Sequence, residues 1–292
     1  MEWRAWYAWA GYVFTCLLPA AFAPALMKNL FAFIERNDTF SHVPFVPMVS
    51  AGLIFLGRER IFAGEKRWSA AGAASALAGF AAVVTAQVNP WQWTLSNQMT
   101  LLLLGFFLVW TGAFGLFFGD HALRAAYFPL LFLGFAIPLP EPFLAGFVGF
   151  LRSGSADAVS AIFHLFHAPV VRHGFEFALP GMTIRVAEEC SGVRSTLALA
   201  MAAALAGNLW LRSFWRTQVL CLAMIPIAIL KNALRIATLS WLAVSVDSRF
   251  LTGRIHHQYG GMIFFVFGLL MLWGVLMVLQ RVQISRGVIR ES

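Results

Sequence analysis

The sequence predicts an all-α polytopic membrane protein with about eight transmembrane helices, interfacial helices and a small β-hairpin before the sixth span. Three observations support this class. Of the 292 residues, 60% are hydrophobic and 12% are charged, whereas soluble domains are typically about 45–50% apolar and about 25% charged. The mean hydropathy is +0.75. Apolar runs close to the roughly 20 residues that a bilayer crossing requires recur along the whole chain.

Five spans are predicted in residues 1–140. Pro19 and Pro24 kink or end the first span, and a loop follows over residues 28–38. Gly119-Asp120-His121 turns the chain from the fourth span into the fifth. The predicted spans are Trp6–Leu26, Val43–Leu56, Trp68–Val88, Met99–Phe118 and Leu123–Ile137.

The third of these spans is rich in Ala and Gly. Gly72 and Ala76, and likewise Ser75 and Gly79, place small residues four apart on one helix face. Small residues let helix backbones approach closely in membranes. The pattern therefore predicts a helix-packing face and not a binding site.

Residues 141–189 have a different pattern. Phe143–Phe166 is apolar but is interrupted by Arg152, Ser153, Gly154, Ser155 and Asp157. This pattern predicts one or two helices that lie at the membrane interface or re-enter it. His164 and His167 share a face, but no third ligand is near in sequence, so we interpret them as interfacial polar residues and expect no metal. Two β-like runs then flank the turn dipeptide Pro180-Gly181 and predict a hairpin outside the hydrocarbon.

The last three spans are predicted at Val193–Leu211, Gln218–Val246 and Gly261–Leu279. We expect a single membrane domain over residues 1–292. It comprises five N-terminal spans in 1–140, an extracytoplasmic or interfacial segment with the hairpin in 141–189, and the final spans with the candidate site in 190–292.

The charges indicate the orientation. With the N-terminus in the cytoplasm, eight spans return the C-terminus there, and 11 basic residues lie inside against 7 outside, as positive-inside topology favours. The clearest contrast is the basic loop Arg58–Arg67 against the uncharged loop Asn89–Asn97. The net charge of +8 does not indicate nucleic-acid binding, because the basic residues form no stripe.

Cys190 is the candidate nucleophile. It precedes the sixth span in the stretch Glu188–Ser195, and Ser191 is a plausible N-cap. A helix N-terminus favours a thiolate, and Arg194 one turn on adds positive charge. The alternative is a small residue at a helix start. The other two cysteines, Cys16 and Cys221, lie inside apolar runs and are interpreted as packing residues.

Charged residues inside the seventh span are the second signal. An arginine in a span is costly and is a functional candidate by default, so Arg235 is singled out, with Lys231 and Asn232 one turn earlier. The alternative is an ion pair that only locks helices, with Glu188, Glu189 or Asp247 as the carboxylate.

Two histidines, His256 and His257, precede the eighth span. They point about 100° apart on a helix, so only one suits a catalytic role. Cysteine with histidine supplies a nucleophile and a general acid–base, and arginine or backbone N–H groups stabilise an oxyanion. Together these groups suit acyl transfer on a peptide bond.

Three motifs in this order resemble those of the exosortase/archaeosortase family of multipass membrane proteins. Cys190–Ser195 resembles the nucleophile motif and Asn232–Ile236 the arginine motif. His257–Gly261, with Phe265 beyond, resembles the histidine motif, although His256, Gly260 and Phe264 have the same spacing. The resemblance covers residues 174–265, and the first five spans match in hydropathy alone.

The resemblance implies a membrane thiol protease or transpeptidase without a cofactor. Its partners would be exported proteins with a C-terminal tripartite sorting signal: a short motif of Pro-Glu-Pro type, a transmembrane helix and a basic tail. Cys190 would attack the peptide bond, Arg235 would support the thiolate or oxyanion, and His257 would shuttle the proton. The acyl-enzyme would pass to a lipid or glycan acceptor at the extracytoplasmic face of the cell membrane. Arg194, Asn232 and Lys231 would support the site.

Three alternatives remain from the residues themselves. A transporter would use Arg235 and Lys231 to bind an anion. An export scaffold would use the same polar residues only for helix packing. A protease without transfer activity shares the acyl-enzyme and differs only in whether water or another nucleophile resolves it.

Overall fold

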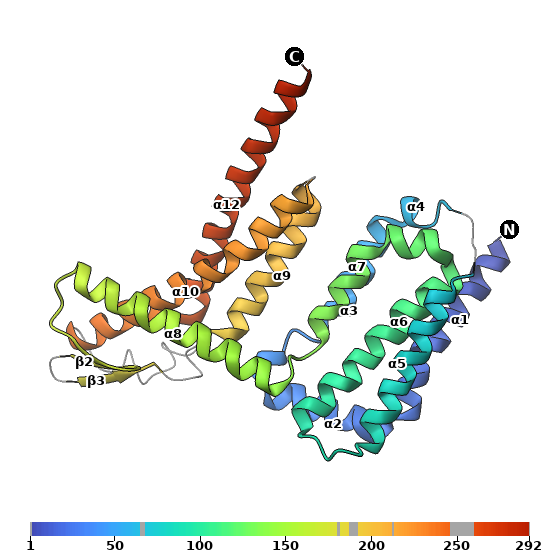
Figure 1. Ribbon diagram of the computed structural model, residues 1–292, viewed down its shortest axis with the longest axis horizontal. Coiled ribbons are helices and arrows are strands. Elements are labelled where there is room, and N and C mark those ends of the chain that lie inside the picture. The colour runs from blue at the N-terminus through green and yellow to red at the C-terminus, as the bar shows by residue number, and fades with distance from the viewer. Residues whose placement is uncertain are drawn as a thin grey trace. The chain divides into compact units, whose positions relative to one another are not determined.

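The computed structural model describes residues 2–291 except 65–67, 180–181, 187–191, 212 and 246–259. Internal contacts divide the chain into two compact units, Met1–Phe143 and Leu144–Ser292 (Figure 1). These are called unit 1 and unit 2 below, and each is described by itself. The expectation of a single membrane domain stays a prediction.

Unit 1 begins with two helices that meet at a sharp bend. Helix α1 (Glu2–Phe22) and helix α2 (Pro24–Arg36) are inclined at 86° to each other. The predicted first span therefore ends at Phe22, and the predicted loop over residues 28–38 is wrong for most of its length. Pro24 begins α2, where proline is tolerated. The spacing of Leu26, Leu30 and Phe33, all buried, gives α2 an apolar face despite its charges.

Helices α5 (Ala70–Val88) and α6 (Leu95–Ala125) form the most extensive helix pair of the described chain. A Cβ added at Gly79 would lie 2.6 Å from the Val109 amide nitrogen, and one at Gly72 would lie 2.8 Å from the Gly112 carbonyl oxygen. The small-residue face predicted for the third span is confirmed, because only glycine permits this backbone approach.

The predicted fifth span, Leu123–Ile137, is wrong as a continuous helix. At Gly119 the backbone leaves helical geometry (φ 88°, ψ 173°) and α6 kinks, where a turn was predicted. The chain then continues as α7 (Tyr127–Phe132) and the 3₁₀-helix η2 (Leu133–Ala136), which pack on α3 (Phe45–Leu56). Residues 127–136 rise only about 15 Å at 1.5 Å per residue, half of a hydrocarbon core. The remaining short elements of unit 1 are η1 (Asp38–Phe40) and α4 (Arg58–Ile61).

The described part of unit 2 contains four helices. Helix α8 (Glu141–Leu165) is one continuous helix, and its polar residues do not interrupt it. Helices α9 (Val193–Trp210), α10 (Phe214–Ser245) and α12 (Gly260–Glu291) share an apolar core. The buried residues at its centre include Leu199, Ala203, Leu220, Ile227, Leu272 and Leu276.

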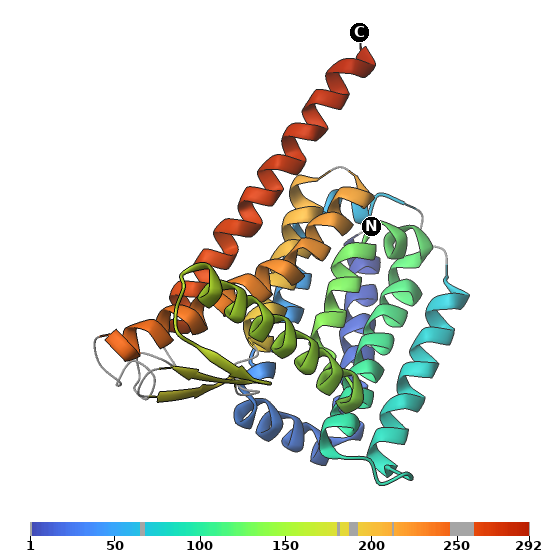
Figure 2. The ribbon, with the colours of Figure 1, turned by 60° about the vertical axis from the view of Figure 1, so that its left-hand side comes forward.

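A small antiparallel sheet lies beside α8 and the C-terminal half of α10 (Figure 2). Its strands are β1 (Val171–His173), β2 (Glu176–Leu179) and β3 (Met182–Arg185), in the order β1-β2-β3. Leu179 pairs with Met182, so β2 and β3 form the predicted hairpin, and β1 adds a third strand. Phe177 of β2 is buried in a cluster with Val159 and Phe163 of α8, and this cluster holds the sheet against α8.

The chain is a multi-pass membrane protein by the length and composition of its helices. Within the described residues, five helices are long and apolar enough to cross a membrane, and up to seven spans result if each of two bent helix pairs counts as one. The prediction of eight spans is not confirmed. Two of the eight predicted spans, Trp6–Leu26 and Leu123–Ile137, fall on the bent pairs, and the helix of the sixth predicted span, α9, is not among the candidates in the described chain.

Candidate functional site

Of the residues predicted for the site, four are described. Lys231, Asn232 and Arg235 lie on α10, and Arg194 lies in the first turn of α9, where it is exposed. The predicted nucleophile Cys190 and both histidines, His256 and His257, lie outside the described residues, as do Glu188, Glu189 and Asp247. The site is therefore built here from α10 and from the described chain that flanks Cys190.

One side of α10 carries the polar residues. Lys231 is 4% exposed and Asn232 is 1% exposed, while Arg235 is half-buried. At 100° per residue, the three side chains occupy one sector of about 100° on the helix. They follow Pro226, where α10 can bend because proline removes one backbone hydrogen bond.

The start of α9 lies directly against this sector. Gly192 caps α9 with a left-handed conformation (φ 72°), which glycine adopts without strain. A Cβ at this position would lie 3.3 Å from Asn232 Oδ1 and 3.5 Å from Lys231 Nζ. Gly192 follows Cys190 by two residues, so the chain leaving the cysteine enters α9 at the Lys231–Asn232 side of α10.

Lys231 is held by both neighbouring helices. Its Nζ donates to Ser195 Oγ at 2.5 Å, and Ser195 Oγ donates to the Gly192 carbonyl at 2.9 Å. Its aliphatic stem packs against Gly268 of α12, where an added Cβ would lie 3.2 Å from Lys231 Cδ. Within the part of the chain that the structure describes, Ser195 is the one polar partner of this buried ammonium.

Asn232 ties α10 to α8. Its Nδ2 donates to Ser155 Oγ at 3.0 Å, and Ser155 is fully buried. The helices approach closely here, because a Cβ at Gly154 would lie 2.8 Å from Ile229 Cδ1. Sequence reasoning missed Ser155 and treated it as an interruption of the helix. The sequence feature that indicates its burial is the four-residue spacing of Leu151, Ser155 and Val159, which places Ser155 on the buried face of α8.

The chain before Cys190 is anchored to the same region. Val186 is 1% exposed and belongs to the buried cluster that includes Ala233 and Ala237 of α10. Its carbonyl accepts a hydrogen bond from Arg152 Nε of α8 at 2.7 Å. The Arg152 guanidinium also lies 3.9 Å from the centre of the Phe175 ring, a cation–π contact.

A second polar contact joins α8 to the sheet, in addition to the hydrogen bond from Arg152 to the Val186 carbonyl. Arg172 of β1 forms an ion pair with Asp157 of α8 at 2.8 Å. The two links hold both ends of the sheet to α8, and the sheet delivers the chain toward residue 190. The start of α9, the C-terminal half of α10, the start of α12 and the sheet thus gather at one end of unit 2 (Figures 1 and 2).

Two basic side chains of α10 lie close together at this end of unit 2. Lys231 and Arg235 stand one helical turn apart and carry the same sign of charge. Within the described residues of unit 2, ion pairs join Arg172 to Asp157 and Arg185 to Glu176. Fixed cations in a site that excludes water stabilise negative charge that develops during a reaction.

Comparison with known proteins identifies the class. Residues 34–274, more than half of the chain, match the model of the transmembrane exosortase family (Exosortase_EpsH). The chain therefore belongs to the transmembrane exosortase family. No curated protein and no solved structure gives a significant match.

Proposed function

We propose that the chain is a membrane-embedded cysteine protease or transpeptidase of exosortase type. Its substrates would be exported proteins with a C-terminal sorting signal, and its site would face the extracytoplasmic side of the cell membrane. Family membership supports the exosortase-type function. The motifs around Cys190, Arg235 and His257 support the assignment of the residues.

One observation carries the proposal. The described residues on both sides of the Cys190 stretch, Val186 and Gly192, pack against residues 231–237 of α10, the segment that contains Arg235. A cysteine held between two such anchors is constrained to the neighbourhood of that segment, because the chain from 187 to 191 is only five residues long.

In the proposed reaction, the Cys190 thiolate attacks the carbonyl carbon of the scissile peptide bond. A tetrahedral oxyanion forms, and the cationic side of α10 that carries Arg235 stabilises its charge. The C–N bond breaks and His257, or His256 in the alternative register, gives a proton to the leaving amine. The resulting thioester is released when an acceptor nucleophile, on a lipid or glycan, or water, attacks the acyl carbon.

The buried polar residues have positioning roles in this proposal. Lys231 acts through Ser195 on the Gly192 carbonyl, and Asn232 acts through Ser155 on the separation of α8 and α10. Both contacts fix the backbone that enters α9 directly after the cysteine. Arg194, which is exposed on the first turn of α9, adds positive charge near the same backbone.

The test is co-expression with an exported protein that ends in a Pro-Glu-Pro motif, a transmembrane helix and a basic tail. Mass spectrometry of the new C-terminus distinguishes hydrolysis from transfer and gives the mass of the acceptor. Cys190→Ser is expected to accumulate normally and to leave the substrate uncleaved. Normal processing by that variant would refute the assignment of Cys190 as the nucleophile.

A further inference from the structure

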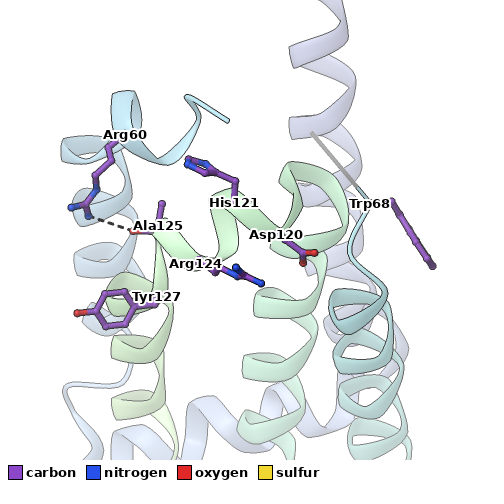
Figure 3. A pocket seen from close by; sticks show the side chains of 7 residues that line it. All are labelled: Arg60, Trp68, Asp120, His121, Arg124, Ala125 and Tyr127. Atoms are coloured by element: carbon purple, nitrogen blue, oxygen red, sulfur yellow. Dashed lines mark hydrogen bonds between the residues drawn. The ribbon is translucent and has the colours of Figure 1, made fainter. Parts of the chain in front are cut away.

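A pocket of about 890 Å³ opens at one end of unit 1, between α4 and the C-terminal turns of α6 (Figure 3). It is remote in sequence from every residue of the proposed site, and its volume is typical of small-molecule sites. It is lined by Arg60, Trp68, Asp120, His121, Arg124, Ala125 and Tyr127.

The pocket lies at the depth of lipid head groups. Helix α5 spans 19 residues, about 28 Å at 1.5 Å per residue, which matches the hydrocarbon core of about 30 Å. Trp68, 70% exposed, precedes α5, and the stacked pair Trp91 and Trp93 follows it. Exposed aromatic side chains at both ends of a span mark the two membrane–water interfaces. Trp68 lines the pocket, so the pocket is at one interface.

Both signs of charge are available in the pocket. Arg124 and Asp120 lie one turn apart at the end of α6 and extend to the same side of the pocket (Figure 3). Within the described residues, neither side chain makes a hydrogen bond or an ion pair. Arg60 reaches the opposite side from α4, and its Nη2 donates to the Ala125 carbonyl at 3.4 Å. Its remaining donors are available to a ligand.

We propose that this pocket binds the head group of a zwitterionic phospholipid with a primary ammonium, of the phosphatidylethanolamine type. The guanidinium of Arg124 receives the phosphate, which planar N–H donors bind well, and Arg60 adds positive charge at the opposite side of the pocket. The Asp120 carboxylate accepts hydrogen bonds from the ammonium, and the Trp68 ring offers a cation–π face. Phosphatidylglycerol lacks the ammonium, and the quaternary ammonium of phosphatidylcholine cannot donate to Asp120.

The predicted orientation gives the leaflet. The loop Arg58–Arg67 is predicted on the cytoplasmic side, and Arg60 belongs to that loop. The bound lipid would thus belong to the cytoplasmic leaflet. Basic pockets between helices on this side are suited to phosphate head groups.

The experiment is native mass spectrometry of the full chain in detergent, with phosphatidylethanolamine, phosphatidylglycerol and phosphatidylcholine of matched acyl chains in equal amounts. We expect phosphatidylethanolamine to be retained over each of the others. Arg124→Gln should lower its retention about tenfold, as loss of a charge-assisted hydrogen bond allows. Asp120→Asn should remove the preference over phosphatidylglycerol. Arg58→Gln and Glu59→Gln are matched controls, because these exposed residues of α4 do not line the pocket.

Two results would overturn the proposal. The first is equal retention of phosphatidylglycerol or phosphatidylcholine by the unaltered chain. The second is retention by Arg124→Gln and Asp120→Asn that equals retention by the two controls. Thermal melting of each variant in the same detergent checks that the chain remains folded.

Discussion

Lys231 Nζ donates a hydrogen bond to Ser195 Oγ at 2.5 Å, and this contact joins the interior of α10 to the first turn of α9. Lys231 is 4% exposed, so its charge is enclosed by protein. A buried charge is costly unless it is paired or serves a function. Ser195 is three residues from Gly192, which is the first described residue after the Cys190 stretch. The contact therefore places the Lys231 ammonium beside the proposed nucleophile segment.

A double-mutant cycle on this pair separates stability from function. Ser195→Ala is expected to destabilise the chain by about 1–3 kcal/mol, because it leaves a buried ammonium without its described partner. Lys231→Met removes the charge at similar volume and is expected to be neutral or stabilising. In the Lys231→Met background, Ser195→Ala should then cost less than about 1 kcal/mol. Chemical unfolding of the full chain in mixed micelles measures the three values.

Substrate processing should not follow stability in this cycle. Lys231→Met is expected to slow processing although the protein is at least as stable, because the backbone entering α9 loses its anchor. Additive stability effects in the cycle, or full processing by Lys231→Met, would show that the pair has only a packing role.

Gly192 is expected to tolerate no side chain. Gly192→Ala places a Cβ in the left-handed region, which costs about 1–2 kcal/mol, and sets it 3.3 Å from Asn232 Oδ1. We expect reduced stability and slower processing, measured on the same substrate. Gly146→Ala is the matched control, since no atom lies within 4 Å of its added Cβ and helical Gly→Ala is favourable by about 1 kcal/mol. Similar behaviour of both variants would contradict this role for Gly192.

Arg152 is expected to be irreplaceable by lysine. Lysine keeps the charge but loses the planar group that bonds the Val186 carbonyl and stacks on Phe175. Arg152→Lys should therefore loosen β3, seen as faster hydrogen exchange of its amides, and slow processing by about tenfold, because small misplacements of a reacting group are costly. Arg185→Lys is the control. Arg185 is exposed, and its ion pair with Glu176 is long, at 3.8 Å, so this pair contributes little to stability.

If hydrogen exchange in β3 were the same in Arg152→Lys and Arg185→Lys, the Arg152 contacts would not be what holds β3 in place. The role proposed for Arg152 in positioning the chain before Cys190 would then fail.

The long helices and the hairpin could be predicted because their signals are local. Apolar length identified α3, α5, α6, α10 and α12, and Pro180-Gly181 between β-like runs identified the turn between β2 and β3. Helix α2 was missed because its charged residues suggested a loop. Its apolar face, at Leu26, Leu30 and Phe33, is visible in the sequence only when read at helical spacing.

The interior of the site was less predictable because it depends on contacts between distant segments. Lys231 and Asn232 were selected as polar residues within a span, and both are buried. Nothing local indicated that Asn232 would meet Ser155, 77 residues away, or that Lys231 would meet Ser195. A polar residue that interrupts an apolar run in the sequence, such as Ser155, can be buried in the fold because a distant side chain hydrogen-bonds to it.

The most direct test of the central claim is to trap the acyl-enzyme. The full chain would be incubated with substrate and quenched in acid, and the peptides that contain Cys16, Cys190 and Cys221 would be weighed by mass spectrometry. We predict a substrate-derived thioester on Cys190, absent in Cys190→Ala and reduced in Arg235→Gln. Substrate cleavage that continues in Cys190→Ala, or a thioester carried by Cys16 or Cys221, would contradict Cys190 as the nucleophile.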